Sequence, residues 1–206
     1  MKKITLIILT LIPLLSFSQT AETVVDNFIN YISKNEIFEI EFSSEILNEN
    51  AGINDNLSGT LIMDTSSFRL QIGELMIIDN GKETINYNGD INEVTIFSNN
   101  DDDEEIINPF SLIFNYKEHF VLHLVSVFQT MFTIDFLPIE QDTFIKLQIV
   151  LDNKTNKISS LYLVDANETE YFYTITKFLP NVKKGRDVFE FNEGDFPEAT
   201  IIDLRD

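Results

Sequence analysis

Hydrophobic and polar residues alternate with two different periods along the chain, and the first stretch has the period of a helix. Residues 21–35 carry apolar side chains three and four positions apart, which places them on one helix face. These side chains are Val24, Val25, Phe28, Ile29 and Ile32. Thr20 can cap the start of the helix. The pattern predicts one amphipathic helix near the N-terminus.

The period then changes to two, which is typical of strands. Phe38, Ile40, Phe42 and Ile46 fall on one face, and Glu39, Glu41 and Glu45 on the other. This alternation predicts a half-buried antiparallel strand. Short strands follow after a predicted turn at 48–56, linked by Gly, Asn, Asp and Ser residues. Their ranges are 58–64, 66–72, 74–79, 83–88 and 92–98, then 120–128, 131–139, 144–152, 157–165 and 169–178. The tail after residue 187 predicts one or two more strands.

Between the two groups of strands lies an acidic stretch, 101–105, followed by an apolar one. Asn108 is a good helix cap, and Pro109 suits the first helical position. We expect a helix over 109–116 that is apolar around most of its circumference because of Phe110, Leu112, Ile113, Phe114 and Tyr116. Such a helix either plugs the core of a barrel or forms a lid. A lid would hold the sheet with one face and cover an apolar cavity with the other.

The first eighteen residues have the pattern of a cleaved signal peptide. Lys2 and Lys3 precede an apolar run from Ile4 to Leu15, and Ser16-Phe17-Ser18 fits a cleavage site. Residues 19–206 then form one predicted domain. The chain has no cysteine, so it can form no disulfide and carry no lipid on an N-terminal cysteine. We therefore expect an exported protein that is not tethered to a membrane.

The net charge and the side-chain chemistry disfavour several classes of ligand and activity. The formal net charge is −20, which opposes binding to nucleic acid or to anionic lipid surfaces. His119 and His123 would suit a metal on a helix, but as strand residues they lie about 13 Å apart and lack a third ligand. The acidic stretch lacks a calcium-loop glycine. No nucleophile elbow or phosphate loop occurs. We expect no enzyme activity, no metal and no cofactor.

The order of several short segments resembles the outer-membrane lipoprotein carrier proteins (LolA-type). They are "SGTLIMDTSSFRLQI", "DNGKETINYN", "NPFSLIF", "KISSLYLVD" before "TEYFYTITKF", and "FEFNEGDFPEATIIDLR". The resemblance implies a mainly β fold with a few helices: an incomplete antiparallel barrel, shaped as a cup, with a helical lid. It also implies a monomeric periplasmic carrier. Such a carrier receives lipoproteins from an inner-membrane lipoprotein-releasing ABC transporter, shields their acyl chains, and passes them to an acceptor at the outer membrane.

The resemblance also implies a set of acyl-binding residues in the cup and the lid. We expect these to be Phe38, Ile40, Phe42, Leu61, Met63, Phe68, Leu70, Phe110, Leu112, Ile113 and Phe114. Phe68 matches a family position at the cup mouth. Family members latch the lid with an arginine where this chain has Asp64-Thr65-Ser66, and the nearby Arg69 alternates with inward-facing neighbours, so we do not assign it that role.

An alternative interpretation keeps the same fold. The chain would be a non-catalytic envelope β domain with a packed interior that binds a protein partner. An apolar pocket under residues 109–116 favours the carrier, and a filled interior favours the alternative.

Overall fold

The structure is a computed structural model that describes residues 19–34, 37–99, 108–140 and 144–205. The predicted signal peptide and the acidic stretch 101–105 lie outside these ranges. Within the described ranges, no helix is long and apolar enough to cross a membrane.

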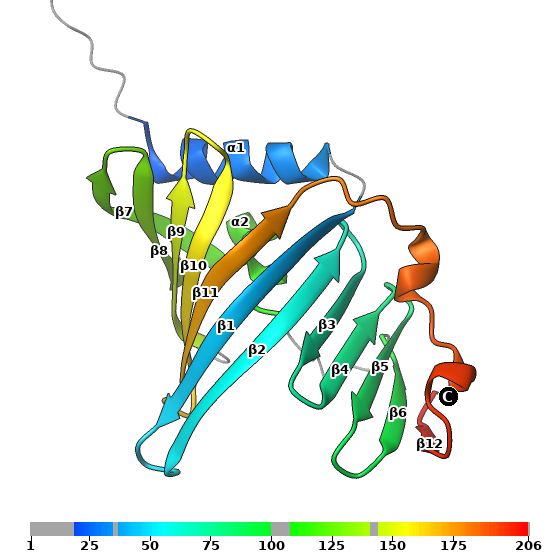
Figure 1. Cartoon of the computed structure of the whole chain (residues 1–206). Helices are drawn as coiled ribbons and strands as arrows, with labels where there is room; N and C mark the ends of the chain where they lie inside the picture. The colour runs from blue at the N-terminus through cyan, green and yellow to red at the C-terminus, as the bar shows by residue number, and fades with distance from the viewer. Residues whose placement is uncertain (1–18, 35–36, 100–107, 141–143, 206) are drawn as a thin grey trace, which may run out of the picture.

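The described strands form one curved, open sheet, in the order β12-β6-β5-β4-β3-β2-β1-β11-β10-β9-β8-β7 (Figure 1). All neighbours are antiparallel except β12, which runs parallel to β6. The strands are β1 (Phe38–Asn48), β2 (Ile53–Met63), β3 (Phe68–Ile72), β4 (Leu75–Asp79), β5 (Glu83–Asn88), β6 (Glu93–Ser98), β7 (Phe120–Phe128), β8 (Met131–Pro138), β9 (Phe144–Asp152), β10 (Lys157–Asp165), β11 (Glu170–Leu179) and β12 (Thr200–Asp203). The sheet ends at β7 and β12 without closing, which confirms the predicted incomplete barrel.

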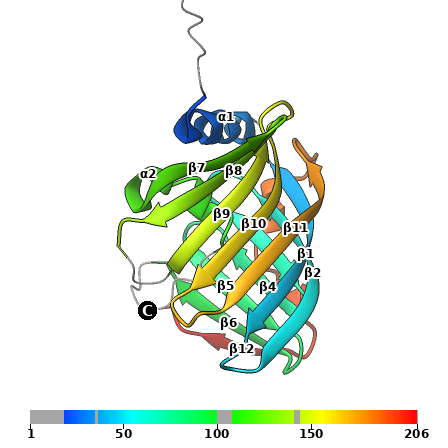
Figure 2. The same cartoon turned by 90° about the vertical axis from the view of Figure 1, so that its left-hand side faces the viewer.

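The two groups of predicted strands become the two walls of the cup. Strands β2–β6 make one wall and β7–β11 the other, and the pairing of β1 with both β2 and β11 joins them (Figures 1 and 2). The turn predicted at 48–56 is shorter than expected, because the strands pair as far as Asn48 and Ile53. Backbone pairing needs no apolar side chain, so the polar residues of this hairpin still form strands.

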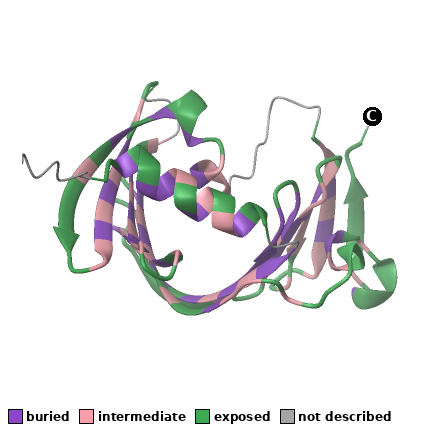
Figure 3. Ribbon diagram, turned by 90° about the horizontal axis from the view of Figure 1, so that it is seen from above, coloured by how far each residue is buried: buried purple, intermediate pink, exposed green. Residues whose placement is uncertain are grey.

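Helix α1 (Ala21–Ser33) lies across the concave side of the sheet, against β7 and β8 (Figure 3). Thr20 caps it as predicted, since its Oγ1 accepts a hydrogen bond from the Thr23 N–H at 3.3 Å. Four of the five predicted apolar side chains of the helix face are buried, and Ile29 is half-buried. The helix therefore covers part of the cup as the hydrophobic pattern requires.

Two hydrophobic cores lie on opposite faces of the sheet. The larger fills the concave side between α1, the segment after Asn108, and the strands. The smaller lies on the outer face of β3–β6, beneath the C-terminal segment with its short 3₁₀ helices η2 (Arg186–Phe189) and η3 (Glu193–Asp195). This tail adds the single strand β12. The concave side is where the predicted binding residues lie.

Candidate functional site

The segment 108–119, here called the lid segment, is not the continuous helix that the sequence predicts. It forms a 3₁₀ turn, η1 (Ser111–Ile113), and a single helical turn, α2 (Tyr116–His119), broken at Asn115. The predicted cap is wrong, because η1 begins at Ser111 with Phe110 as its N-cap and no side-chain cap. Asn108 Oδ1 instead accepts from the Phe110 N–H at 3.0 Å, within the turn that precedes η1. A 3₁₀ helix repeats every three residues, so side chains three apart share a side. Phe110, Ile113 and Tyr116 have this spacing, and all three are buried.

Beneath the lid segment the interior is filled by aromatic rings. The ring centroid of Phe110 lies 6.0 Å from that of Phe42 and 5.8 Å from that of Tyr173. Phe42 and Tyr173 meet edge to face at 5.4 Å. Burial raises the pKa of the Tyr173 hydroxyl above its usual range. The lid segment thus closes this part of the cup with its own side chains.

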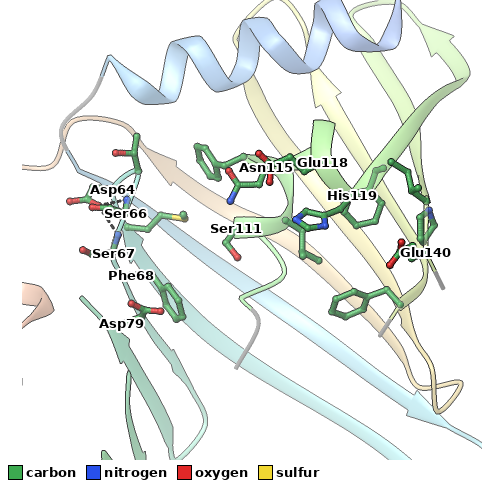
Figure 4. Close-up of a pocket in the computed structure, with 18 residues that line it drawn as sticks. Asp64, Ser66, Ser67, Phe68, Asp79, Ser111, Asn115, Glu118, His119 and Glu140 are labelled. Carbon is green, nitrogen blue, oxygen red and sulfur yellow. Dashed lines mark hydrogen bonds between the residues drawn. The ribbon is translucent and has the colours of Figure 1, made fainter. Parts of the chain in front are cut away.

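A pocket of about 740 Å³ opens on the other side of the lid segment (Figure 4). Its walls come from the β2–β3 turn, from the lid segment, and from the adjoining ends of β7, β8 and β9. The apolar lining residues are Met63, Phe68, Leu112, Phe114, Phe120, Pro138, Ile139 and Phe144. The polar lining residues are Asp64, Thr65, Ser66, Ser67, Asp79, Ser111, Asn115, Glu118, His119 and Glu140. The pocket lining is therefore mixed, with apolar side chains beside polar and acidic ones.

The eleven predicted binding residues divide between the pocket and the filled interior. Those that line the pocket are Met63, Phe68, Leu112 and Phe114. Those that pack in or against the larger core without lining the pocket are Phe38, Ile40, Phe42, Leu61, Leu70, Phe110 and Ile113. The structure brings both groups to the concave side, on either side of the lid segment.

The β2–β3 turn, where the resemblance implies an arginine, is organised by a buried aspartate. Asp64 Oδ1 accepts from the backbone N–H groups of Ser66 and Ser67, both at 2.8 Å. Arg186 of η2 reaches it from the C-terminal segment, with its Nη1 2.6 Å from Asp64 Oδ2. Arg69 faces the outer core, as its alternation predicts, and its Nη1 donates to the Val188 carbonyl at 3.4 Å.

The lid segment is fastened to α1 through Asp26. Tyr116 donates from its hydroxyl to Asp26 Oδ1 at 3.0 Å, and Lys117 Nζ lies 2.9 Å from the same oxygen. The Tyr116 ring packs edge to face on Phe136, with centroids 5.9 Å apart. Burial and the Asp26 carboxylate raise the pKa of the Tyr116 hydroxyl, so it stays a donor. No sequence motif signals this contact, because its partners lie ninety residues apart.

Several pocket residues were not predicted from the sequence. His119 ends α2 and lines the pocket, whereas His123 lies in β7. Within the described ranges, no three His, Cys, Asp or Glu side chains gather closely enough to hold a metal ion. Phe120, Ile139 and Phe144 line the pocket because they stand at strand ends beside the lid segment, a proximity that only the fold creates.

Comparison with known proteins gives one family and several similar structures. The family model described as outer membrane lipoprotein carrier protein LolA matches residues 33–192. The sequence matches no curated protein significantly. An uncharacterized conserved protein from Thermus thermophilus is similar in structure, with a TM-score of 0.59 and 11% identity over 90% of this chain and 99% of that one.

Two further solved structures are similar at lower scores. A LolA superfamily protein from Nitrosomonas europaea has a TM-score of 0.47 and 8% identity, over 84% of this chain and 99% of that one. An outer membrane lipoprotein-sorting protein domain from Vibrio parahaemolyticus, described as putative, has a TM-score of 0.46 and 8% identity, over 84% of this chain and 96% of that one.

Proposed function

Because the chain belongs to the LolA family of outer membrane lipoprotein carrier proteins, we propose that it binds lipoprotein acyl chains in the cup and carries them through the periplasm to the outer membrane. An inner-membrane lipoprotein-releasing ABC transporter would supply the cargo. The carrier would perform no chemistry on it.

The pocket against the lid segment is the observation that carries this proposal. Its volume of about 740 Å³ falls within the range of small-molecule sites, roughly 300–1,000 Å³. Leu112 and Phe114 line it from the lid segment, and Phe68 lines it from β3. An acyl chain entering here gains roughly 0.8 kcal/mol for each methylene removed from water.

Release is the harder step for such a carrier, and the filled interior offers a way to achieve it. Phe110 and Ile113 occupy the space beneath the lid segment. When acyl chains occupy it instead, the lid segment gives up its own apolar burial. The net affinity is then the difference between two apolar contacts, which keeps binding weak enough for transfer.

The filled interior also supports the alternative function, a non-catalytic envelope domain that binds a protein partner. Phe42, Phe110 and Tyr173 pack as a continuous aromatic cluster and do not line the pocket. If the lid segment never leaves this cluster, long acyl chains cannot enter beneath it.

A binding experiment separates the two functions. The protein lacking residues 1–18 is mixed with a dipalmitoylated lipopeptide, and the complex is detected by native mass spectrometry. Leu112→Glu, which places a charge on the pocket wall, should abolish binding, whereas Ile91→Glu, at an exposed site away from the pocket, should not. Absence of binding by the unaltered protein would reject the carrier function. Lipoproteins that co-purify from the cell envelope would identify the cargo.

A further inference from the structure

Strand β7 is an edge of the sheet, and it begins at the pocket. It pairs only with β8, and among the described residues no strand lies beyond it (Figures 1 and 2). Phe120, its first residue, and His119, the last residue of α2, line the pocket. A row of backbone groups therefore leads directly away from the proposed acyl site.

The hydrogen-bond ladder shows which of these groups are open. The Ile139 N–H donates to the His119 carbonyl at 2.8 Å, so these two residues face each other across the ladder. In an antiparallel pair such positions alternate, so Val121 and His123 direct their backbone groups toward β8. Leu122 then directs its N–H and carbonyl toward the open edge, and the Phe120 carbonyl does the same. The Phe120 N–H is not open, because it donates a hydrogen bond to the Tyr116 carbonyl.

This edge has few of the features that normally prevent strand addition. Proteins protect edges with lysines, prolines, bulges or a covering element. Residues 120–124 contain no proline, lysine, arginine, aspartate or glutamate. Helix α1 packs against β7 and β8 from the concave side of the sheet (Figure 3). A bulge between Leu124 and Ser126 interrupts the ladder farther on, so the open part is the half nearest the pocket. The opposite edge, β12, ends in the paired charges of Asp203 and Arg205.

We propose that the open edge of β7 between Phe120 and Leu124 binds the peptide that follows the acylated residue of a lipoprotein, as an added strand. This inference rests on the proposed function. Lipoproteins carry their acyl chains on an N-terminal cysteine, so the peptide leaves the pocket from its N-terminus. Following β7 away from the pocket, it runs parallel to β7.

Two physical arguments favour this occupant. Strand addition recognises the backbone through main-chain hydrogen bonds, so it can accept cargo of many sequences. Acyl chains held in the pocket also raise the effective concentration of the attached peptide at β7, so a weak pairing becomes significant. A free peptide without acyl chains has no such advantage and should bind poorly.

The test uses a set of synthetic lipopeptides with the full domain. The parent carries dipalmitoylglyceryl cysteine followed by about eight uncharged residues, which span the open edge at about 3.3 Å each. Two variants carry N-methyl groups on alternate residues, one on the odd set and one on the even set. We expect one variant to bind about tenfold more weakly, through loss of about two hydrogen bonds, and the other to bind like the parent.

The outcomes distinguish this inference from the proposed function. Equal affinity of both N-methylated variants and the parent overturns the strand addition, while binding of dipalmitoylglyceryl cysteine amide alone still supports the carrier. Failure of that acyl compound to bind overturns both. The direction of the bound peptide is checked with a nitroxide label. Because the chain has no cysteine, Gln129→Cys gives a single labelling site just after the end of β7. Parallel pairing predicts paramagnetic broadening at the C-terminal end of the peptide, and its absence contradicts the pairing.

Discussion

The hydroxyl of Tyr116 donates a hydrogen bond to the carboxylate of Asp26 across 3.0 Å, and this contact joins the lid segment to α1. Tyr116 is only 3% exposed, and its ring also packs on Phe136 of β8. One side chain thus fixes the lid segment to both the helix and the sheet. The contact is thus a polar link between the lid segment and α1, in addition to the apolar packing.

Removing this hydroxyl should loosen the lid segment. Tyr116→Phe keeps the ring and deletes one hydrogen bond, so we expect unfolding free energy to fall by about 0.5–1.5 kcal/mol. Amides of residues 111–119 should also exchange faster with solvent, while those of β9 and β11 are unchanged. Lys117→Met is the matched control, because Lys117 is mostly exposed and its ion pair contributes little. If lid amides are as protected as β9 in every variant, the segment is a fixed plug.

Alkaline pH should weaken the same contact. Burial and Asp26 raise the pKa of Tyr116 in the folded protein, whereas an unfolded tyrosine titrates near about 10. The unfolded chain therefore releases the proton first, and stability falls as pH rises above about 10. Below that pH the contribution is fully present. Urea denaturation between about pH 8 and 11 should show a shallower decline for Tyr116→Phe, with the remaining slope coming from other tyrosines such as Tyr173.

Asp64 should matter far more for stability than its partner Arg186. Asp64→Ala leaves the N–H groups of Ser66 and Ser67 without their acceptor, so we expect a loss of about 1–3 kcal/mol. Arg186→Ala removes a mostly exposed side chain and should cost less than about 1 kcal/mol. Denaturant titration of both variants gives the comparison. Equal losses would mean that the ion pair, and not the turn, is the main contribution.

Phe68 should tolerate a charge because it borders the pocket. In Phe68→Glu the carboxylate can reach solvent in the pocket, so the fold should survive, while lipopeptide affinity falls roughly tenfold or more from the lost apolar contact. Phe136→Glu places the same charge at a site with 0% exposure and should prevent folding. Circular dichroism and lipopeptide binding report the two effects. Phe68 is only 7% exposed and also packs in the larger core. Unfolding of both variants would show that this packing, and not access to the pocket, decides the result, and it would support the alternative function.

The sequence predicts the sheet well because the pattern that predicts each strand lies within that strand and its adjoining turns. The alternation of Phe38, Ile40 and Phe42 with glutamates, and the turn residues between strands, depend only on near neighbours. The linear order of these signals also predicts the two meanders and the covering helix α1.

The lid segment and the pocket could not be predicted in the same way. Apolar residues at 110–116 indicated a helix, but the broken geometry depends on which of them find space in the cup. Whether Phe42 lines a cavity or packs against Phe110 is decided by strands and segments far apart in sequence. The same holds for Asp26 and Tyr116, which carry no shared motif.

Neighbouring residues of the lid segment should respond oppositely to truncation. Ile113 is 1% exposed and packs in the filled interior. Ile113→Ala should therefore lower the free energy of unfolding by about 2–5 kcal/mol, as is usual when a large buried side chain is truncated. Phe114 lines the pocket and is half-buried, with its ring centroid 6.3 Å from that of Phe38, so Phe114→Ala should cost less than about 2 kcal/mol.

Lipopeptide affinity should instead fall more for Phe114→Ala, because its ring lines the pocket. Loss of Ile113 opens space beneath the lid segment and should leave binding unchanged or stronger. Thermal denaturation and lipopeptide titration of both variants measure the two effects. A larger loss of affinity for Ile113→Ala would contradict this competition, because it would mean that the Ile113 side chain supports acyl binding and does not oppose it.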